Sequence, residues 1–85
     1  MAMIVSKPDR VVTADIHGMT ADDAKRQLEQ LLGRLSPQTE ELLVIHGYNG
    51  GQKLRDMVRG RLKHPRIQSK LLSLNPGQTR ILLKK

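Results

Sequence analysis

Cysteine, phenylalanine and tryptophan are absent from this 85-residue chain, and Tyr48 is its one aromatic residue. The missing cysteines exclude disulfide bonds and thiolate metal sites. No apolar run approaches the roughly 18 residues that span a bilayer. The amino terminus also lacks the charged-then-apolar pattern of a signal peptide. We therefore expect a cytoplasmic protein that does not associate with membranes and has a small aliphatic core.

Charge is distributed very unevenly along the chain, whose net charge is +7. Residues 1–50 contain five Lys or Arg and seven Asp or Glu, whereas residues 51–85 contain ten Lys or Arg and one acidic residue, Asp56. The first part thus carries −2 and the second +9. Such asymmetry is typical of proteins with a polyanionic partner, although a solvated basic surface would give the same count.

Hydrophobic periodicity predicts a single domain over residues 11–85, preceded by a flexible lead-in over residues 1–10. Strands are expected at 11–16, 42–45, near 67–74 and at 79–83. Helices are expected from Thr20 to an end marked by Gly33 and Pro37, and from about 52 to 63. The continuous apolar run 42–45 is typical of a central strand buried on both faces. Within the second helix, Arg61 falls among the apolar positions at 100° per residue, and we expect it to extend past the helix end.

These elements predict an α/β fold, a two-layer α/β sandwich in the order β-α-β-α-β-β. The sheet is expected to be mixed, mostly parallel and four-stranded, with two helices. Three strands should run parallel and the last antiparallel, after a turn at residues 75–78.

Two histidine signatures, Asp15-Ile16-His17-Gly18 and His46-Gly47-Tyr48-Asn49-Gly50-Gly51, follow the first two predicted strands. The carboxyl ends of parallel strands meet at one sheet edge, where open α/β sheets bind ligands. Asp15 and His17 are two residues apart, so both should face the same side. The glycines and the following helix start can bring backbone amides close to an anion.

Basic side chains on the second helix extend this candidate phosphate site. Lys53, Arg55 and Arg59 are expected on its exposed side and flanks, and arginine forks bind phosphate in a bidentate manner. Tyr48 could stack on a base or simply shield its loop. A solvated helix face is the alternative for the cations.

Two chemistries are open to Asp15, His17 and His46. Three such ligands can hold a metal ion, and magnesium stays an alternative, but the surrounding Lys and Arg disfavour a cation. An acid–base mechanism without metal or cofactor fits better, in which one imidazole removes a proton and the other protonates the leaving oxygen. Basic groups and loop amides would stabilise the charge on phosphorus.

With these residues the chain resembles the Smr (small MutS-related) domain family over about residues 11–84. The family shows Asp-x-His-Gly after its first strand, then a His-Gly, a glycine-rich turn and Leu-Arg, here Leu54-Arg55, and a His-Pro, here His64-Pro65. The resemblance is to the stand-alone bacterial form of a domain that also ends MutS2-type proteins. It implies nucleic-acid binding, DNA nicking or RNA cleavage, and in some members a site of action on ribosomes.

The resemblance implies that Asp15, His17 and the Gly47–Gly51 loop form the active site, with Arg55 beside them. The loop departs from the family pattern, because it is one residue longer, has Asn49 in place of a glycine and lacks threonine. We therefore expect an endonuclease in which Asp15, His17 and His46 are catalytic, or else a non-catalytic DNA- or RNA-binding module. A protein-interaction domain is a third reading, and the oligomeric state is open.

Overall fold

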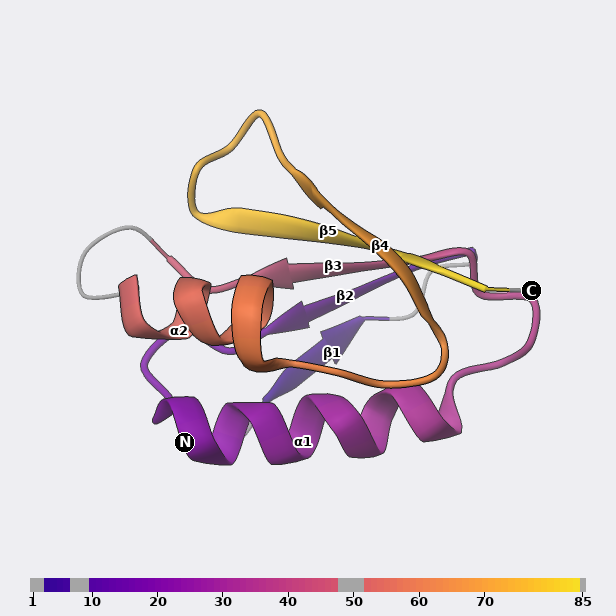
Figure 1. Ribbon diagram of the computed structural model, residues 1–85, viewed down its shortest axis with the longest axis horizontal. Helices are drawn as coiled ribbons and strands as arrows, with labels where there is room; N and C mark the ends of the chain where they lie inside the picture. The colour runs from indigo at the N-terminus through magenta and orange to yellow at the C-terminus, as the bar shows by residue number, and fades with distance from the viewer. Residues whose placement is uncertain (1–2, 7–9, 48–51, 85) are drawn as a thin grey trace.

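The computed structural model describes residues 3–6, 10–47 and 52–84. Its elements are β1 (Ile4–Ser6), β2 (Val11–Asp15), α1 (Ala21–Arg34), β3 (Glu41–Ile45), α2 (Gln52–Asp56), a π-helical turn η1 (Met57–Arg61), β4 (Ile67–Leu72) and β5 (Gln78–Leu83). The predicted order of strands and helices is present, with one additional strand inside the expected lead-in (Figure 1).

One mixed five-stranded sheet has the order β1-β2-β3-β5-β4, and only the β2–β3 pair is parallel. The prediction of a four-stranded, mostly parallel sheet is therefore wrong. β1 adds an antiparallel edge beside β2, and β5 inserts between β3 and β4. β2, β3 and β4 do run in the same direction, as predicted, but β4 does not neighbour the other two. A place inside the sheet suits β5 because Thr79, Ile81 and Leu83 are buried, whereas Leu71 and Leu72 of the edge strand β4 are exposed.

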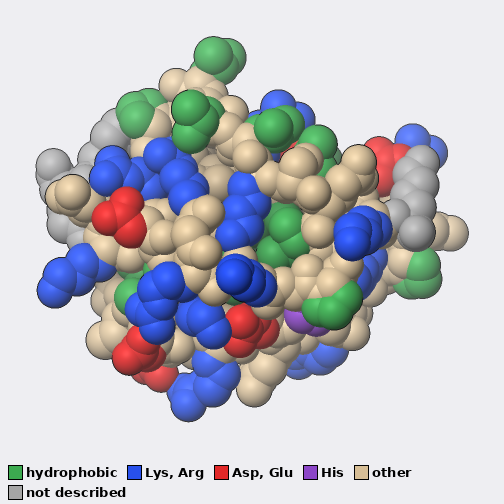
Figure 2. All heavy atoms as spheres, viewed as in Figure 1, with side chains coloured by type: hydrophobic (Ala, Val, Ile, Leu, Met, Phe, Trp, Pro, Cys, Tyr) green, Lys and Arg blue, Asp and Glu red, His purple; other side chains and the backbone are tan. Residues whose placement is uncertain are grey.

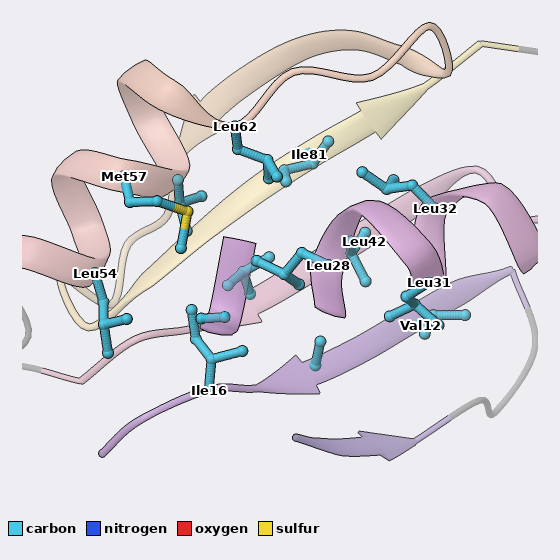
Figure 3. Packing of buried hydrophobic residues seen from close by; sticks show 14 of the residues in the cluster. Val12, Ile16, Leu28, Leu31, Leu32, Leu42, Leu54, Met57, Leu62 and Ile81 are labelled. Carbon is cyan, nitrogen blue, oxygen red and sulfur yellow. The ribbon is translucent and has the colours of Figure 1, made fainter. Parts of the chain in front are cut away.

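Both helices cover the same face of the sheet, which leaves the other face open (Figure 1). Leu42 and Val44 of β3 are fully buried under the helices, while Leu43 and Ile45 are half-buried on the open face. The expectation that β3 is buried on both faces is wrong, since no element covers Leu43 and Ile45 among the described residues. Figure 3 shows the aliphatic core between the helices and the sheet, with Leu28 of α1 and Met57 of η1 facing Ile81 and Leu42.

α1 begins as predicted at Thr20, whose Oγ1 accepts a hydrogen bond from the Asp23 amide at 3.3 Å. Asp22 and Asp23 in the first turn complement the positive end of the helix dipole. Gly33 lies inside the last turn, and the helix ends at Leu35. No helix in the described ranges is long and apolar enough to cross a membrane.

The second helix changes its period at Met57. The Leu62 amide donates to the Met57 carbonyl five residues earlier, at 2.7 Å, which is the bond of a π-helix. Met57, Val58 and Leu62 are buried, and Arg61 is turned out to solvent. The wider turn thus explains why Arg61 falls among the apolar positions at α-helical spacing but lies outside the core.

Candidate functional site

Asp15 and His17 form a hydrogen-bonded pair at the carboxyl end of β2. Asp15 Oδ1 lies 2.5 Å from His17 Nδ1 and also accepts the His17 backbone amide at 3.1 Å. The Asp15 side chain is 25% exposed and that of His17 57% exposed. Within the described residues His17 Nε2 has no hydrogen-bond partner. The carboxylate therefore fixes the ring orientation and favours a proton on Nδ1, which leaves Nε2 as a proton acceptor facing solvent.

The two histidine signatures meet at one sheet edge, as the parallel β2 and β3 predict. Asp15 pairs with Ile45 in register. Gly47 adopts φ +87°, and a Cβ placed on it would lie 3.6 Å from the Cβ of His17. Gly18 adopts φ +82°. Both turns thus require glycine for their positive φ angles. The turn at Gly47 brings the chain after β3 against the Asp15–His17 pair.

His46 lies beneath this surface. It continues the alternation of Leu42 and Val44, so its ring points to the helix-covered face and is 1% exposed. Nε2 lies 2.9 Å from Thr79 Oγ1, and Nδ1 lies 3.3 Å from the Gly47 carbonyl. In this conformation His46 does not reach the surface on which His17 is exposed.

Thr79 connects His46 to Arg59. Arg59 Nε donates to Thr79 Oγ1 at 3.1 Å, so the threonine hydroxyl hydrogen is free to be donated to His46 Nε2. His46 Nδ1–H can then donate to the Gly47 carbonyl. The Thr79 hydroxyl and both ring nitrogens of His46 are thus paired when His46 is neutral with its proton on Nδ1. A second ring proton would leave the buried threonine hydrogen without an acceptor.

Burial is the largest effect on the pKa of His46 and lowers it from its usual value. The Gly47 backbone opposes this in part, the positive charges of Arg59 and then Arg55 lower the pKa further, and the Gln78 backbone raises it slightly. His46 is therefore neutral at physiological pH. Arg59 lies close to the ring because it and His46 hydrogen-bond the same Thr79 hydroxyl, and Arg55 lies one turn earlier on the second helix. The structure thus gathers these two cations, His46, Gly47 and the Asp15–His17 pair at one end of the sheet.

Backbone amides of the glycine-rich loop are only partly available for a ligand. The amides of His46 and Gly47 donate to the Gly77 carbonyl at 2.9 and 3.0 Å, so neither points at an anion. Tyr48, Asn49, Gly50 and Gly51, which the sequence assigns to phosphate binding, lie outside the described residues. Of the helix cations, Lys53 is exposed, and Arg55 is half-buried with its Nε 3.4 Å from Asp56 Oδ1.

A family model of the Smr domain matches residues 14–80. The chain belongs to the Smr domain family. This family has nucleic-acid-binding and nuclease roles. The crystal structure of the Smr domain of Thermus thermophilus MutS2 shares the fold, with a TM-score of 0.75 and 24% sequence identity over 86% of this chain and 98% of that one. No curated protein sequence matches the chain.

Sequence reasoning missed two residues of this Smr domain site, Gly77 and Thr79. The sequence gives no signal for Gly77, because its role is that of a backbone carbonyl. This carbonyl accepts hydrogen bonds from the chain after β3 and so joins it to the β4–β5 turn. Thr79 had a signal, since it lies in phase with the apolar Ile81 and Leu83 of one strand. A threonine at such a position is buried and needs a hydrogen-bond partner.

The histidine of the His-Pro pair serves the fold of this Smr domain. His64 Nδ1 accepts the Arg66 amide at 3.1 Å, and its Nε2 is 3.8 Å from the Cβ position of Gly33. His64 therefore packs against α1, away from the Asp15–His17 pair. No cluster of three or more His, Asp or Glu side chains suited to a metal ion occurs in the described part of the chain.

Proposed function

We propose that this Smr domain binds nucleic acid and cleaves phosphodiester bonds by acid–base chemistry at His17. The observation that carries the proposal is the Asp15–His17 pair, in which the carboxylate holds Nδ1 and Nε2 faces solvent at the carboxyl edge of the sheet. The proposal includes a cytoplasmic location, with RNA or DNA, free or on ribosomes, as the substrate.

In the proposed reaction His17 Nε2 removes the proton of the attacking oxygen. On RNA this oxygen is the neighbouring 2′-hydroxyl, which attacks phosphorus while the 5′-oxygen leaves. On DNA it is a water molecule, which is harder to activate. Asp15 holds the ring and stabilises the imidazolium that forms, as the carboxylate of a catalytic triad does.

His46 has a different place in this proposal from the one that the sequence suggested. Because its ring is buried, we propose that solvent protonates the leaving oxygen and that His46 is a positioning residue. It holds Arg59 through Thr79 and supports the Gly47 turn. The charge on the phosphate would be neutralised by Lys53, Arg55 and Arg59, together with the loop Gly47–Gly51. Within this loop, Tyr48 would stack on a base.

Cleavage of a structured RNA and of supercoiled plasmid by the purified protein, with EDTA or with magnesium, tests the proposal. His17→Ala and Asp15→Asn should lower cleavage by about 10²-fold or more while nucleic-acid affinity changes only a few-fold. His64→Gln is the matched control, since His64 packs on α1 and should retain cleavage. Equal loss of cleavage and binding in His17→Ala would contradict a catalytic role.

One observation favours a non-catalytic nucleic-acid-binding module as the second candidate. At this edge of the sheet only one described imidazole, that of His17, is exposed, so the second proton-transfer group that the sequence suggested is not at the surface. Binding of both nucleic acids without cleavage in either the EDTA or the magnesium arm would decide for this candidate.

A further inference from the structure

Three leucines at the end of β4 and in the turn that follows it are exposed. Leu71 is 39% exposed, Leu72 is 72% exposed and Leu74 is fully exposed at 105%. Of the five exposed large hydrophobic residues among the described ones, these three fall within four positions. Leu72 and Leu74 therefore contribute little burial to folding, and neighbouring exposed apolar side chains mark an interaction site.

The turn that presents these leucines is held by its own side chains. Asn75 Oδ1 accepts the Gly77 amide at 2.9 Å, and the Asn75 carbonyl accepts the Gln78 amide at 3.0 Å. Ser73 Oγ accepts the Asn75 amide at 3.3 Å. The leucines are therefore displayed on an ordered support, which lowers the entropy cost of binding.

This turn lies at the same sheet edge as the candidate active site. The Gly77 carbonyl accepts the amides of His46 and Gly47, and Gly47 adjoins His17. In Figure 2 hydrophobic side chains gather at the top of the molecule, where Figure 1 places the β4–β5 turn, and Lys and Arg side chains lie directly below them. An apolar tip thus stands beside a basic surface and the Asp15–His17 pair.

The charges and strands around the exposed leucines favour nucleic acid over protein as their binding partner. A second copy of a chain with net charge +7 would be repelled by this basic surface. Addition of a strand along β4 is discouraged by the irregular register between Ile67 and Ser69. Proteins that distort nucleic acids insert leucine and similar apolar side chains between base steps.

We propose that Leu72 and Leu74 form an apolar wedge that contacts unstacked bases next to the phosphodiester bound at Asp15–His17. The domain would then prefer nucleic acid with an unpaired bulge to a fully paired duplex. This inference rests on the proposed nucleic-acid binding, but it does not depend on whether the domain cleaves its ligand.

The wedge has a signature that distinguishes it from a charged contact. Phosphate contacts release counterions and set the slope of log affinity against log salt, whereas an apolar contact with a base releases none. Replacing the leucines should therefore lower affinity for the bulged ligand without changing the salt slope.

Fluorescence anisotropy of the full chain with a short duplex, and with the same duplex carrying a bulge, tests the wedge. Both ligands are made as DNA and as 2′-O-methyl RNA, which lacks the attacking hydroxyl, and 2-aminopurine in the bulge reports unstacking. We expect about tenfold tighter binding of the bulged ligand, and loss of this preference in the double variant L72S/L74S with duplex affinity and salt slope unchanged.

Two matched variants complete the test. L72M/L74M keeps apolar side chains and should keep the preference. Val11→Ser removes an exposed apolar residue at the amino end of β2, the end of the strand opposite Asp15, and should change nothing. A bulge preference that survives in L72S/L74S would overturn the wedge and leave the leucines to a protein partner. Failure of the wild-type chain to bind any ligand would instead overturn the proposed function itself.

Discussion

At the scale of single residues, the buried Thr79 hydroxyl is the junction on which the site depends. It accepts from Arg59 and can donate to His46, so one side chain fixes the protonation state of a histidine and the position of a cation. This chain of bonds connects the sheet interior to the basic surface of the second helix.

Replacement of Thr79 by valine should therefore destabilise the domain by about 1–3 kcal/mol, because it leaves the buried His46 Nε2 without a partner. Thr79→Ser keeps the hydroxyl and should lose less. Urea denaturation of the three proteins measures the difference. A loss in the serine variant larger than that in the valine variant would instead assign the effect to the methyl group, which valine keeps and serine lacks.

The lowered pKa of His46 predicts that stability depends on pH. The unfolded chain binds a proton at the ordinary histidine value of 6.5, but the folded chain binds it only at lower pH. The contribution of His46 is therefore complete above pH 6.5 and is lost as pH falls below it towards the folded-state pKa.

The free energy of unfolding should thus decrease between about pH 7.5 and about pH 5, a range in which carboxylates stay largely ionised. In His46→Gln this decrease should be smaller, because the variant lacks the imidazole whose pKa is lowered by folding. The residues His17 and His64 are common to both proteins and contribute equally. Parallel curves for the variant and the wild type would contradict a neutral, buried His46.

At the scale of elements, the carboxyl end of each helix is capped by a basic side chain that donates to its last carbonyls. One of these side chains comes from β4 and the other from the segment before it. Arg66 donates to the carbonyls of Leu32, Leu35 and Ser36 at the end of α1, at 3.2, 2.5 and 2.9 Å. Lys70 Nζ donates to the Leu62 carbonyl after η1 at 2.5 Å, and burial together with the nearby Lys63 lowers its pKa. Cations suit helix carboxyl termini because carbonyl groups and the helix dipole are negative there.

Arg66→Ala should therefore destabilise the domain by about 1–3 kcal/mol by leaving three carbonyls without a donor. Arg66→Lys should recover only part of this loss, because an ammonium group cannot reproduce the guanidinium fork. Thermal unfolding monitored by circular dichroism provides the measurement, with the exposed Lys63→Ala as the control. A full rescue by lysine would show that charge alone matters.

Local signals were sufficient to predict most of the elements. The Thr20 cap and the spacing of Leu28, Leu31 and Leu35 depend on neighbours in sequence, and α1 begins where they indicate. β1 was missed because Ile4–Ser6 is too short for a pattern and is stabilised by its pairing with β2. The π-turn showed only as the anomaly of Arg61, since hydrophobic periodicity assumes a constant helical period.

At the scale of the whole molecule, the basic residues of 51–85, which give this part a charge of +9, fall into two groups. Some stabilise the fold, and others are exposed to a binding partner. Arg66 and Lys70 hold helix ends, and Arg80 forms a bidentate ion pair with Glu41 on the open sheet face at 2.8 and 3.2 Å, which raises its pKa. These cations serve the fold. Lys53 is exposed near the candidate site, so the surface that can meet a polyanion is smaller than composition suggests.

Nucleic-acid binding should accordingly show a salt dependence in which Lys53 takes part. Lys53→Ala should reduce the slope of log affinity against log salt by about one, the effect of a lost phosphate contact. Lys84→Ala is the matched control, because Lys84 follows β5 at the opposite end of the sheet and should leave the slope unchanged. Titrations at several salt concentrations give both slopes, and an equal change in the two variants would indicate diffuse attraction.

The sequence could predict where the two signatures meet, because β2 and β3 are parallel strands joined by a helix. It did not predict which side chains face outwards. His46 was expected beside His17, but its phase with Leu42 and Val44 turns it into the core. That distinction depends on which face of the sheet the helices cover, and only the packing of the whole domain determines it.

The place of β5 between β3 and β4 bears on when the domain can fold during its synthesis. Until the ribosome has released residue 83, β4 has no neighbour in the sheet, and β3 exposes the edge on which Thr79 and Ile81 will pair. A nascent chain that ends before β5 lacks the strand that joins β3 to β4, and it lacks Thr79, the hydrogen-bond partner of His46. We therefore expect this domain to acquire its structure in one late step after its last strand emerges, rather than progressively from its amino terminus.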